Sequence, residues 1–447
     1  MTQTIEDTCW KFAGALSSLS AGDGRSVLRR SSATSSLVRE ATERIIGRVR
    51  CDGDHALREM ALAYDGVSID ALEVSRAVRR RALDDVAPPV RSALERAARN
   101  IGSFHGAFPP RTVEVETEPG VTVGRWSDPL ERVGIYAPGG RAAYASSVLM
   151  AGIPARIAGV AEIVLCSPPQ SDGSPASIVL AACEIAGIDR VFSVGGAGAI
   201  AAMAYGTETI PRVDRIVGPG NAYVAEAKLQ VCRDVAIDSP AGPSELLVIC
   251  DATCDADTIA HEVVAQAEHD VNACVVVICI DDATAVSIAN AVEQILTDAP
   301  RADVIRAALE QSGVLVTAAS ITEAIRFANE FAPEHLLLAF DDPERVLPDV
   351  RNAGCVFVGE SSSVVFGDYL TGGNHVLPTG GLARSYSGLG TLDFVRWTSY
   401  QKVTPEAAQR LASDTAILAS AEGLPAHAAA ALAPRAQAKR SEFRVNQ

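Results

Sequence analysis

The feature that most constrains the fold of this chain is a repeated alternation between short apolar strands and helix-like stretches. Residues 133–136, 162–166 and 190–194 are rich in apolar and β-branched side chains, and stretches with helical spacing separate them. Strands that are joined by helices lie parallel in one sheet, which is buried on both faces. The sequence therefore predicts a parallel sheet in the middle of the chain.

A second series of the same kind follows directly. Its strands and helices are expected at 246–250, 257–268, 273–280, 283–296 and 313–317. Upstream, the apolar spacing is helical from 37 to 105, and β-branched stretches follow at 112–117 and 121–123. Residues 393–432 are Ala-rich and are expected to be helical, with a basic tail beyond them. The fold class is α/β, and the expected order is helices, two α/β units and a helical end.

Composition excludes several classes of function. The length of 447 residues is typical of about two domains. A net charge of −16 and a pI near 5.0 would repel a phosphate backbone, so no nucleic-acid partner is expected. The mean hydropathy is +0.16, and no apolar run approaches the roughly 18 residues of a membrane span. Because the first residues resemble no targeting signal, we expect a soluble, cytoplasmic protein.

The ten cysteines are scattered without any Cys-x-x-Cys pair, and several lie in apolar stretches such as residues 274–279. This distribution predicts reduced, buried thiols and argues against a zinc site built from cysteines.

Histidines provide the first indication of chemistry. The chain has only seven, and most stand beside carboxylates or carboxamides. Gln266 and His269 are three residues apart on an expected helix and therefore share a face, while Asp368 follows Gly367 at an expected turn. With a fourth donor, these side chains would form a mixed nitrogen and oxygen shell suited to zinc or a similar divalent ion. The alternative is that Gln266 and His269 form only a hydrogen-bonded helix end.

Glu334 and His335 follow Pro333 at an expected loop-to-strand junction. Adjacent residues of a strand point to opposite faces, so only a turn-like backbone would let both side chains reach one pocket. In the functional interpretation, His335 is a general base and Glu334 is its partner or an activator of water. The alternative is a surface glutamate beside a half-buried histidine.

Glycine clusters provide the third indication. Gly196-x-Gly198-x-x-Ala201 stands after an expected strand and before a helix, as a dinucleotide-binding fingerprint requires. Residues 138–140 and 218–221 form two further glycine turns where a ligand can approach the backbone. No acidic residue ends an obvious next strand at the expected distance, so a tight turn without a ligand is the alternative.

The motifs taken together resemble the histidinol dehydrogenase family from about Val38 to about Arg435. The resemblance is carried by residues 133–140, 218–223, 239–245, 266–269, 333–335, 367–369, 374–379, 387–390 and 422–427.

The resemblance implies a fold of two incomplete Rossmann-like domains with a helical N-terminal region and a helical C-terminal dimerisation tail. The expected parts are an arm at 1–30, a first α/β domain made of 31–132 and 246–388, a nucleotide-binding α/β domain at 133–245, and the tail at 389–447. It also implies a homodimer in which the C-terminal segment is shared between the subunits.

The resemblance also assigns roles to residues. Glu334 and His335 are then the acid–base residues, and one Zn²⁺ per subunit is held by Gln266, His269, Asp368 and His427, the last possibly from the other subunit. Substrate contacts are expected at Ser244, Gln266, His269, His335, Asp368, His375, Glu422 and His427. Contacts with the cofactor NAD are expected at Tyr136, Gly198 and Asn221.

The implied reaction is the oxidation of L-histidinol through L-histidinal to L-histidine with two NAD⁺, a step of histidine biosynthesis. One alternative is a paralogous zinc-dependent dehydrogenase of another polar alcohol, such as a sulfonated diol. Another is a zinc-binding relative that has lost cofactor use. Four positions depart from the family pattern: Gly198 replaces a usual Gln, Ala145 a usual Pro, and Gly373 and Gly390 replace the common Thr and Ser.

Overall fold

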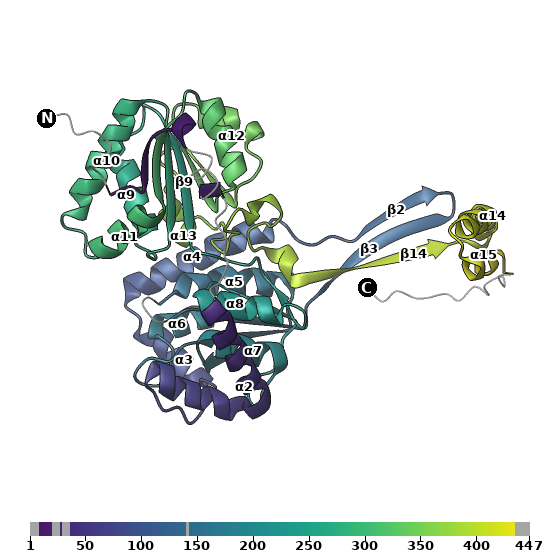
Figure 1. Ribbon diagram of the computed structural model, residues 1–447. Helices are drawn as coiled ribbons and strands as arrows, with labels where there is room; N and C mark the ends of the chain where they lie inside the picture. Colours follow the sequence, from purple (N-terminus) through teal and green to yellow (C-terminus); the bar gives the residue numbers. More distant parts are fainter. Residues whose placement is uncertain (1–8, 20–26, 29–35, 140–142, 434–447) are drawn as a thin grey trace. The chain divides into compact units, whose positions relative to one another are not determined.

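The computed structural model describes residues 9–19, 27–28, 36–139 and 143–433. The chain forms two compact units (Figure 1). The larger contains Met1–Pro109 and Leu130–Phe394, and the smaller contains Pro110–Pro129 and Val395–Gln447. In the described ranges, no helix is long and apolar enough to cross a membrane.

One sheet of the larger unit has five parallel strands in the order β6-β5-β4-β7-β8. They are β4 (Arg132–Tyr136), β5 (Glu162–Ser167), β6 (Arg190–Ser193), β7 (Arg215–Val217) and β8 (Ala236–Ile237). Numbered along the chain, this order is 3-2-1-4-5, which matches the first five positions of the doubly wound dinucleotide-binding sheet. The expected parallel sheet is confirmed.

The second sheet has six parallel strands in the order β1-β11-β10-β9-β12-β13. They are β1 (Phe12–Ala15), β9 (Glu245–Cys250), β10 (Cys274–Cys279), β11 (Gly313–Thr317), β12 (His335–Ala339) and β13 (Cys355–Val358). Strands β9 to β13 repeat the order 3-2-1-4-5. Every residue of β9, β10 and β12 is buried, which explains why these strands are continuous apolar stretches.

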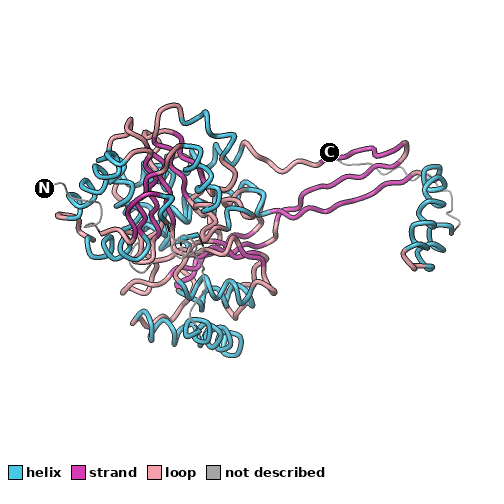
Figure 2. The backbone as a smooth tube through the Cα atoms, turned by 45° about the horizontal axis from the view of Figure 1, so that its top comes forward, coloured by secondary structure: helices cyan, strands magenta, loops and turns pink. Residues whose placement is uncertain are grey.

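Helices cover both sheets (Figure 2). Those around the five-stranded sheet are α2 (Ser36–Met60), α3 (Arg76–Asp85), α4 (Pro88–Gly106), α5 (Ala145–Ala158), α6 (Ser177–Ala186), α7 (Gly196–Tyr205) and α8 (Ala222–Val231). Those around the six-stranded sheet are α9 (Ala256–Ala267), α10 (Asp282–Leu296), α11 (Ala302–Ser312) and α12 (Ile321–Phe331), and the short α13 (Val364–Tyr369) follows β13. The helices expected at 257–268 and 283–296 are therefore found.

The packing of the N-terminal helices differs from the expected grouping of 31–132 with 246–388. Helix α2 packs on α7 and α8, α3 on α6, and α4 on α5. The cause is the apolar face of α2, since Val49, Leu57 and Met60 belong to one core with the residues of α7. These helices therefore belong to the layer that covers the five-stranded sheet.

The expected N-terminal arm at 1–30 is partly ordered into a sheet. β1 pairs with β11, and Cys9 and Trp10 are buried in the core of the six-stranded sheet. Residues 1–8, 20–26 and 29–30, like the basic tail from 434 onward, lie outside the described residues.

The smaller unit contains an antiparallel sheet in the order β14-β3-β2, with α14 (Pro405–Ala421) and α15 (Pro425–Leu432) at one end of it (Figure 1). Its strands are β2 (Val113–Glu118), β3 (Val121–Pro129) and β14 (Val395–Val403). The expectation of helix throughout 393–432 is wrong at β14. This stretch is rich in aromatic and β-branched residues, and β3 supplies its hydrogen-bonding partner over nine residue pairs.

Candidate active site

The predicted acid–base pair, Glu334 and His335, lies at the amino ends of two neighbouring strands. β12 begins at His335, and Glu334 directly precedes it, while Glu245 begins β9, beside β12. The N–H of Glu245 donates to Glu334 Oε2 at 2.8 Å, and the carbonyl of Glu245 accepts from His335 Nδ1 at 3.0 Å. Both catalytic candidates are therefore held by the backbone of one residue. Sequence reasoning assigned no role to Glu245, although it lies in a quoted motif.

The contact with Glu245 sets the tautomer of His335. A carbonyl only accepts hydrogen bonds, so Nδ1 carries the proton and Nε2 presents a lone pair. Nε2 is buried without a hydrogen-bond partner in the part of the chain that the structure describes, and it lies 3.7 Å from Asp368 Oδ1. Burial lowers the pKa of His335 to about 4, and the nearby His375 and His269 act in the same direction. The ring is neutral at pH 7, with one nitrogen available to accept a proton.

The pKa of Glu334 shifts upward, whereas that of His335 shifts downward. Burial raises the pKa of Glu334 well above its usual value, against the hydrogen bond from the Glu245 N–H, and the carboxyls of Glu245 and Asp368 raise it further. Its Oε2 lies 3.5 Å from His335 Nδ1, so the two side chains share one pocket. Glu334 precedes the strand that begins at His335. The two side chains therefore need not point to opposite faces, and both can reach one pocket.

Asp368 lies near the end of α13 rather than at the expected turn. A Cβ on Gly367 would lie 2.5 Å from the ring of Phe357, so the glycine lets α13 lie close to β13. Asp368 is half-buried, and burial raises its pKa to about 7, with a further contribution from Glu262.

His375 is bonded at both ring nitrogens. Nδ1 lies 2.8 Å from the carbonyl of Asp368, to which it donates, and Nε2 then accepts from the hydroxyl of Ser147 at 3.0 Å. The expected contact of His375 with a substrate would therefore replace the bond to Ser147. Sequence reasoning missed Ser147, because its partner stands 228 positions away.

The neighbouring Asn374 fixes this segment to α5. Pro154 interrupts α5 and lacks the N–H that would bond to the carbonyl of Met150. Asn374 Nδ2 donates to that carbonyl at 2.6 Å. The polar segment that holds His375 is thus joined to the helix layer of the five-stranded sheet.

Gln266 and His269 lie at the end of α9, as predicted. Gln266 is buried, and its Nε2 has no hydrogen-bond partner among the described residues. His269 follows the helix and keeps an exposed surface, while partial desolvation lowers its pKa. Ser244 directly precedes β9 and is half-buried.

The predicted ligands in the larger unit provide part of a metal-binding set. No group of three or more His, Cys, Asp or Glu side chains in the described ranges is arranged to hold one. Of the predicted ligands, His269 and Asp368 are the His or Asp side chains that belong to the larger unit. Gln266 adds an amide whose Nε2 has no hydrogen-bond partner among the described residues. Imidazole, carboxylate and amide donors fit a divalent ion such as Zn²⁺, with one ligand still to be supplied.

Two predicted residues belong to the smaller unit. Glu422 is the C-cap of α14, His427 lies in α15, and both side chains are exposed there. They are therefore accessible for contacts outside their own unit.

The predicted nucleotide contacts gather at the carboxyl edge of the five-stranded sheet. Tyr136 ends β4, and its hydroxyl accepts from the N–H of Gly196, at the start of α7, at 3.0 Å. Burial raises the pKa of Tyr136 to about 12. Asn221 caps α8, accepting from the N–H groups of Tyr223 and Val224, which leaves its amide nitrogen for another partner. Gly140, in the expected glycine turn at 138–140, lies outside the described residues.

A buried ion pair holds the turn after β7. Lys228 Nζ donates to Asp238 Oδ1 and to the carbonyl of Gly218, each at 2.5 Å, and Asp238 Oδ2 accepts from the N–H of Gly218 at 2.7 Å. Gly218 has φ +112°, and a Cβ there would lie 2.1 Å from the carbonyl oxygen of Tyr136. Only glycine fits this close approach. Sequence reasoning did not identify Lys228 or Asp238.

Gly198 has a packing explanation. A Cβ at this position would lie 3.2 Å from Met60 Sδ and 3.3 Å from Leu57 Cδ2, both in α2. The position therefore faces the neighbouring helix. The cofactor contact expected here remains a prediction.

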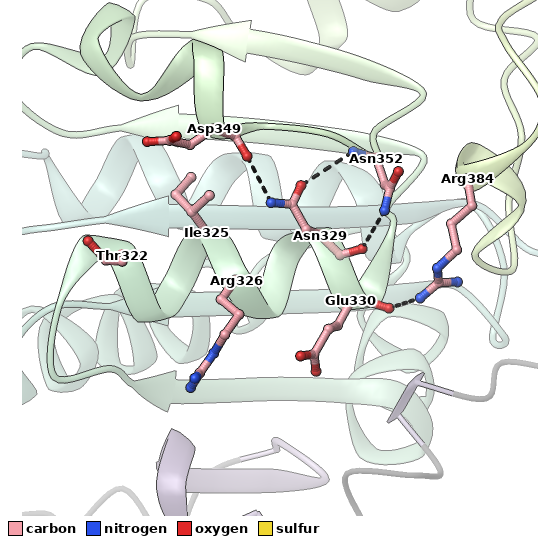
Figure 3. Close-up of a pocket in the computed structure, with 8 residues that line it drawn as sticks. All are labelled: Thr322, Ile325, Arg326, Asn329, Glu330, Asp349, Asn352 and Arg384. Atoms are coloured by element: carbon pink, nitrogen blue, oxygen red, sulfur yellow. Dashed lines mark hydrogen bonds between the residues drawn. The ribbon is translucent and has the colours of Figure 1, made fainter.

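An open recess of about 550 Å³ lies elsewhere, along α12 (Figure 3). Three of its side chains bond to the backbone of neighbouring lining residues: Asn329 donates to the carbonyl of Asp349 at 2.9 Å, Asn352 to the carbonyl of Asn329 at 2.9 Å, and Arg384 to the carbonyl of Glu330. None of the predicted site residues lines this recess. Its contacts attach the segment around Arg384 to α12.

Two doubly wound parallel sheets, together with a buried carboxyl and imidazole held at adjacent strand ends, are features of an α/β enzyme. Comparison with known proteins identifies the family. A sequence model of histidinol dehydrogenase matches residues 28–434. The chain therefore belongs to the histidinol dehydrogenase family.

Individual relatives support the same result. The chain is 48% identical to the histidinol dehydrogenase of Methanothermobacter thermautotrophicus over 384 residues, which are 86% of this chain and 90% of the relative. It is 43% identical to that of Burkholderia lata over 429 residues, 93% and 97% of the two chains. The crystal structure of histidinol dehydrogenase from Elizabethkingia anophelis superposes with a TM-score of 0.90 at 35% identity, over 95% of this chain and 97% of that one.

Proposed function

We propose that this chain oxidises L-histidinol through L-histidinal to L-histidine, with transfer of one hydride to each of two NAD⁺ molecules. The observation that carries the proposal is the geometry of Glu334, His335 and Glu245. One nitrogen of a neutral imidazole is available and buried, and a carboxyl stands beside it. Family membership supports the choice of substrate and cofactor.

In the first oxidation, His335 Nε2 takes the proton of the alcohol while the hydride leaves the carbon. The carbonyl of Glu245 already accepts from Nδ1, so Nε2 is the ring nitrogen that accepts the proton. In the second oxidation, Glu334 assists the addition of water to the aldehyde. Burial raises the pKa of Glu334, so its carboxylate is a stronger proton acceptor than an exposed one when it assists water.

The proposed zinc ligands are Gln266, His269, Asp368 and His427. When bound, the ion would supply Lewis-acid orientation of the amine and imidazole of the substrate. Substrate contacts are proposed for these ligands and for Ser244, His335, His375 and Glu422. NAD contacts are proposed at Tyr136, Gly198 and Asn221, beside the turn at Gly218.

We also propose a homodimer of chains that each contain two incomplete Rossmann-like domains. In this arrangement the C-terminal segment from 389 onward is shared, so that His427 and Glu422 of one copy serve the site of the other. The exposure of both side chains, and the missing ligand in the larger unit, support this arrangement.

A panel of substrates tests the function. Histidinol should give a higher kcat/KM than diols, sulfonated diols or amino alcohols without the ring, by as much as ~10⁴-fold, because unpaired buried polar groups disfavour such analogues. A clear preference for an alcohol without the ring would contradict the proposal and favour a paralogous dehydrogenase.

A further inference from the structure

Glu245, the first residue of β9, bonds through three different groups to three parts of the candidate site. Its N–H donates to Glu334 Oε2 at 2.8 Å, and its carbonyl accepts from His335 Nδ1 at 3.0 Å. Its side-chain Oε1 accepts from the N–H of Gly380 at 2.9 Å. The residue is only 2% exposed, so these bonds are shielded from competing water.

The third bond reaches the segment that carries His375, a predicted substrate contact. Gly380, further along this segment, has φ +65° and lies in a turn that the N–H of Leu382 closes on the carbonyl of Thr379 at 3.1 Å. The side chain of Glu245 therefore joins the start of β9 to the segment of His375.

The opposite neighbour of β12 makes a different kind of contact. At the start of β13, the N–H groups of Gly354 and Cys355 donate to the carbonyls of Pro333 and Glu334, each at 2.9 Å. A Cβ on Gly354 would lie 2.6 Å from the carbonyl oxygen of Glu334. These contacts all involve the backbone of the acid–base pair, whereas Glu245 bonds to both of its side chains.

The position of Glu245 at a strand end explains why its own side chain matters. The ends of regular elements open more readily than their middles, and opening here would release both side chains of the pair. The bond from Gly380 to Oε1 opposes that opening, since it ties the first residue of β9 to a neighbouring segment. Precise placement affects the rate, because a displacement of about 1 Å can cost about 10²-fold.

We propose that Glu245 is a positioning residue, whose side chain fixes the start of β9 and thereby holds Glu334 and His335 in the geometry for proton transfer. The inference rests on the proposed function, because it assigns a role within that reaction. The alternative is a structural role, in which the carboxyl only provides an acceptor for the N–H of Gly380.

Two substitutions at Glu245 separate these roles. Glu245→Met keeps the length of the side chain but removes the oxygen acceptor, whereas Glu245→Gln keeps an oxygen that can accept from Gly380. In full-length protein with zinc and NAD⁺, we expect Glu245→Met to lower kcat for histidinol by about 10²-fold, with a much smaller change in KM. Glu245→Gln should recover most of the loss. Wild-type kcat in folded Glu245→Met, assayed below its unfolding transition, would overturn the proposal.

Thr379 offers a matched control. Its Oγ1 accepts from the N–H of Gly242 at 2.5 Å, so it joins the same two segments three residues before Glu245. Thr379→Val removes this bond without removing the one at Glu245, and kcat should fall much less than in Glu245→Met. An equal loss in the two variants would show that Glu245 has no particular role, and would overturn the proposal.

Hydrogen exchange at the amide of residue 245 provides a measurement that needs no substrate. In the wild-type protein this amide should exchange slowly, because it donates to Glu334. Glu245→Met should raise its rate by up to about tenfold, the scale of one lost hydrogen bond, and Glu245→Gln should keep it slow.

The two measurements distinguish failure of the positioning role from failure of the proposed function. A wild-type protein that does not oxidise histidinol contradicts the proposed function. Unchanged slow exchange in Glu245→Met contradicts the positioning role. If Glu245→Met does not fold, rapid exchange of this amide in the wild-type protein would overturn the proposal.

Discussion

The two parallel sheets share the strand order 3-2-1-4-5 but place their polar residues at opposite edges. In the five-stranded sheet, Tyr136 and the Gly218 turn lie at the carboxyl ends of β4 and β7, where doubly wound sheets usually bind ligands. In the six-stranded sheet, Glu245 and His335 lie at the amino ends of β9 and β12. Strand order is thus the same in both sheets, whereas the residues that start or end each strand decide at which edge the polar groups gather.

Metal removal, which acts at the proposed site of the six-stranded sheet, should cause the largest loss of turnover. Elemental analysis should find about one zinc per subunit, and strong chelation should abolish turnover, because orientation of the substrate is lost. Adding zinc back should restore the rate. Full activity in metal-free protein would show that Gln266, His269 and Asp368 do not form a metal site.

His335→Asn tests the amino edge directly. We expect kcat to fall by about 10²-fold or more with both histidinol and histidinal, the usual scale for loss of a general base. Cys254→Ser, at the other edge of the same sheet, is the control and should keep the wild-type kcat. An equal decrease of kcat in the two variants would show that the amino edge is not specifically the site of catalysis.

Glu334→Gln separates the two oxidations. The amide keeps the size of the side chain but cannot accept a proton, so oxidation of histidinal should slow by about 10²-fold. Oxidation of histidinol, followed as a single turnover, should change much less. The same loss in both steps would contradict the separate role of Glu334.

Asp238→Asn tests the carboxyl edge of the five-stranded sheet. Lys228 would remain as an unpaired buried charge, which costs about 3–5 kcal/mol in the free energy of unfolding. The KM for NAD⁺ should also rise, with a smaller change in kcat, because the amide offers one acceptor oxygen where Lys228 and the Gly218 N–H now use two. Glu95→Gln, in an exposed pair with Arg91, is the control and should change stability by less than about 1 kcal/mol. An unchanged KM in a folded Asp238→Asn protein would show that this turn does not serve the cofactor.

Gly198→Gln should have the smallest effect on activity. The side chain would be directed at Met60 and Leu57, so we expect a loss of about 1–3 kcal/mol in stability from overpacking. If the proposed cofactor contact at this position is right, the added amide should lower the KM for NAD⁺ by up to about tenfold. An unchanged KM would contradict the contact and leave only the packing against α2.

Local patterns were enough to predict much of the fold. The strand expected at 313–317 is β11, and the helix expected at 257–268 is α9, shifted by one residue. Apolar runs and a capping Asp255 act within a few residues, so they can be read without the rest of the chain. The family motifs likewise located Glu334, His335 and Asp368 by position along the chain.

The sequence by itself determined the class of elements, the parallel sheets and the family. Tertiary structure alone decided that the N-terminal helices cover the five-stranded sheet and that Gly198 faces α2. It also brought Glu245 to His335, 90 positions away, and Cys250 to Cys279, 29 positions away. The physical reason is that these outcomes depend on packing and pairing between distant segments, which local propensity does not encode.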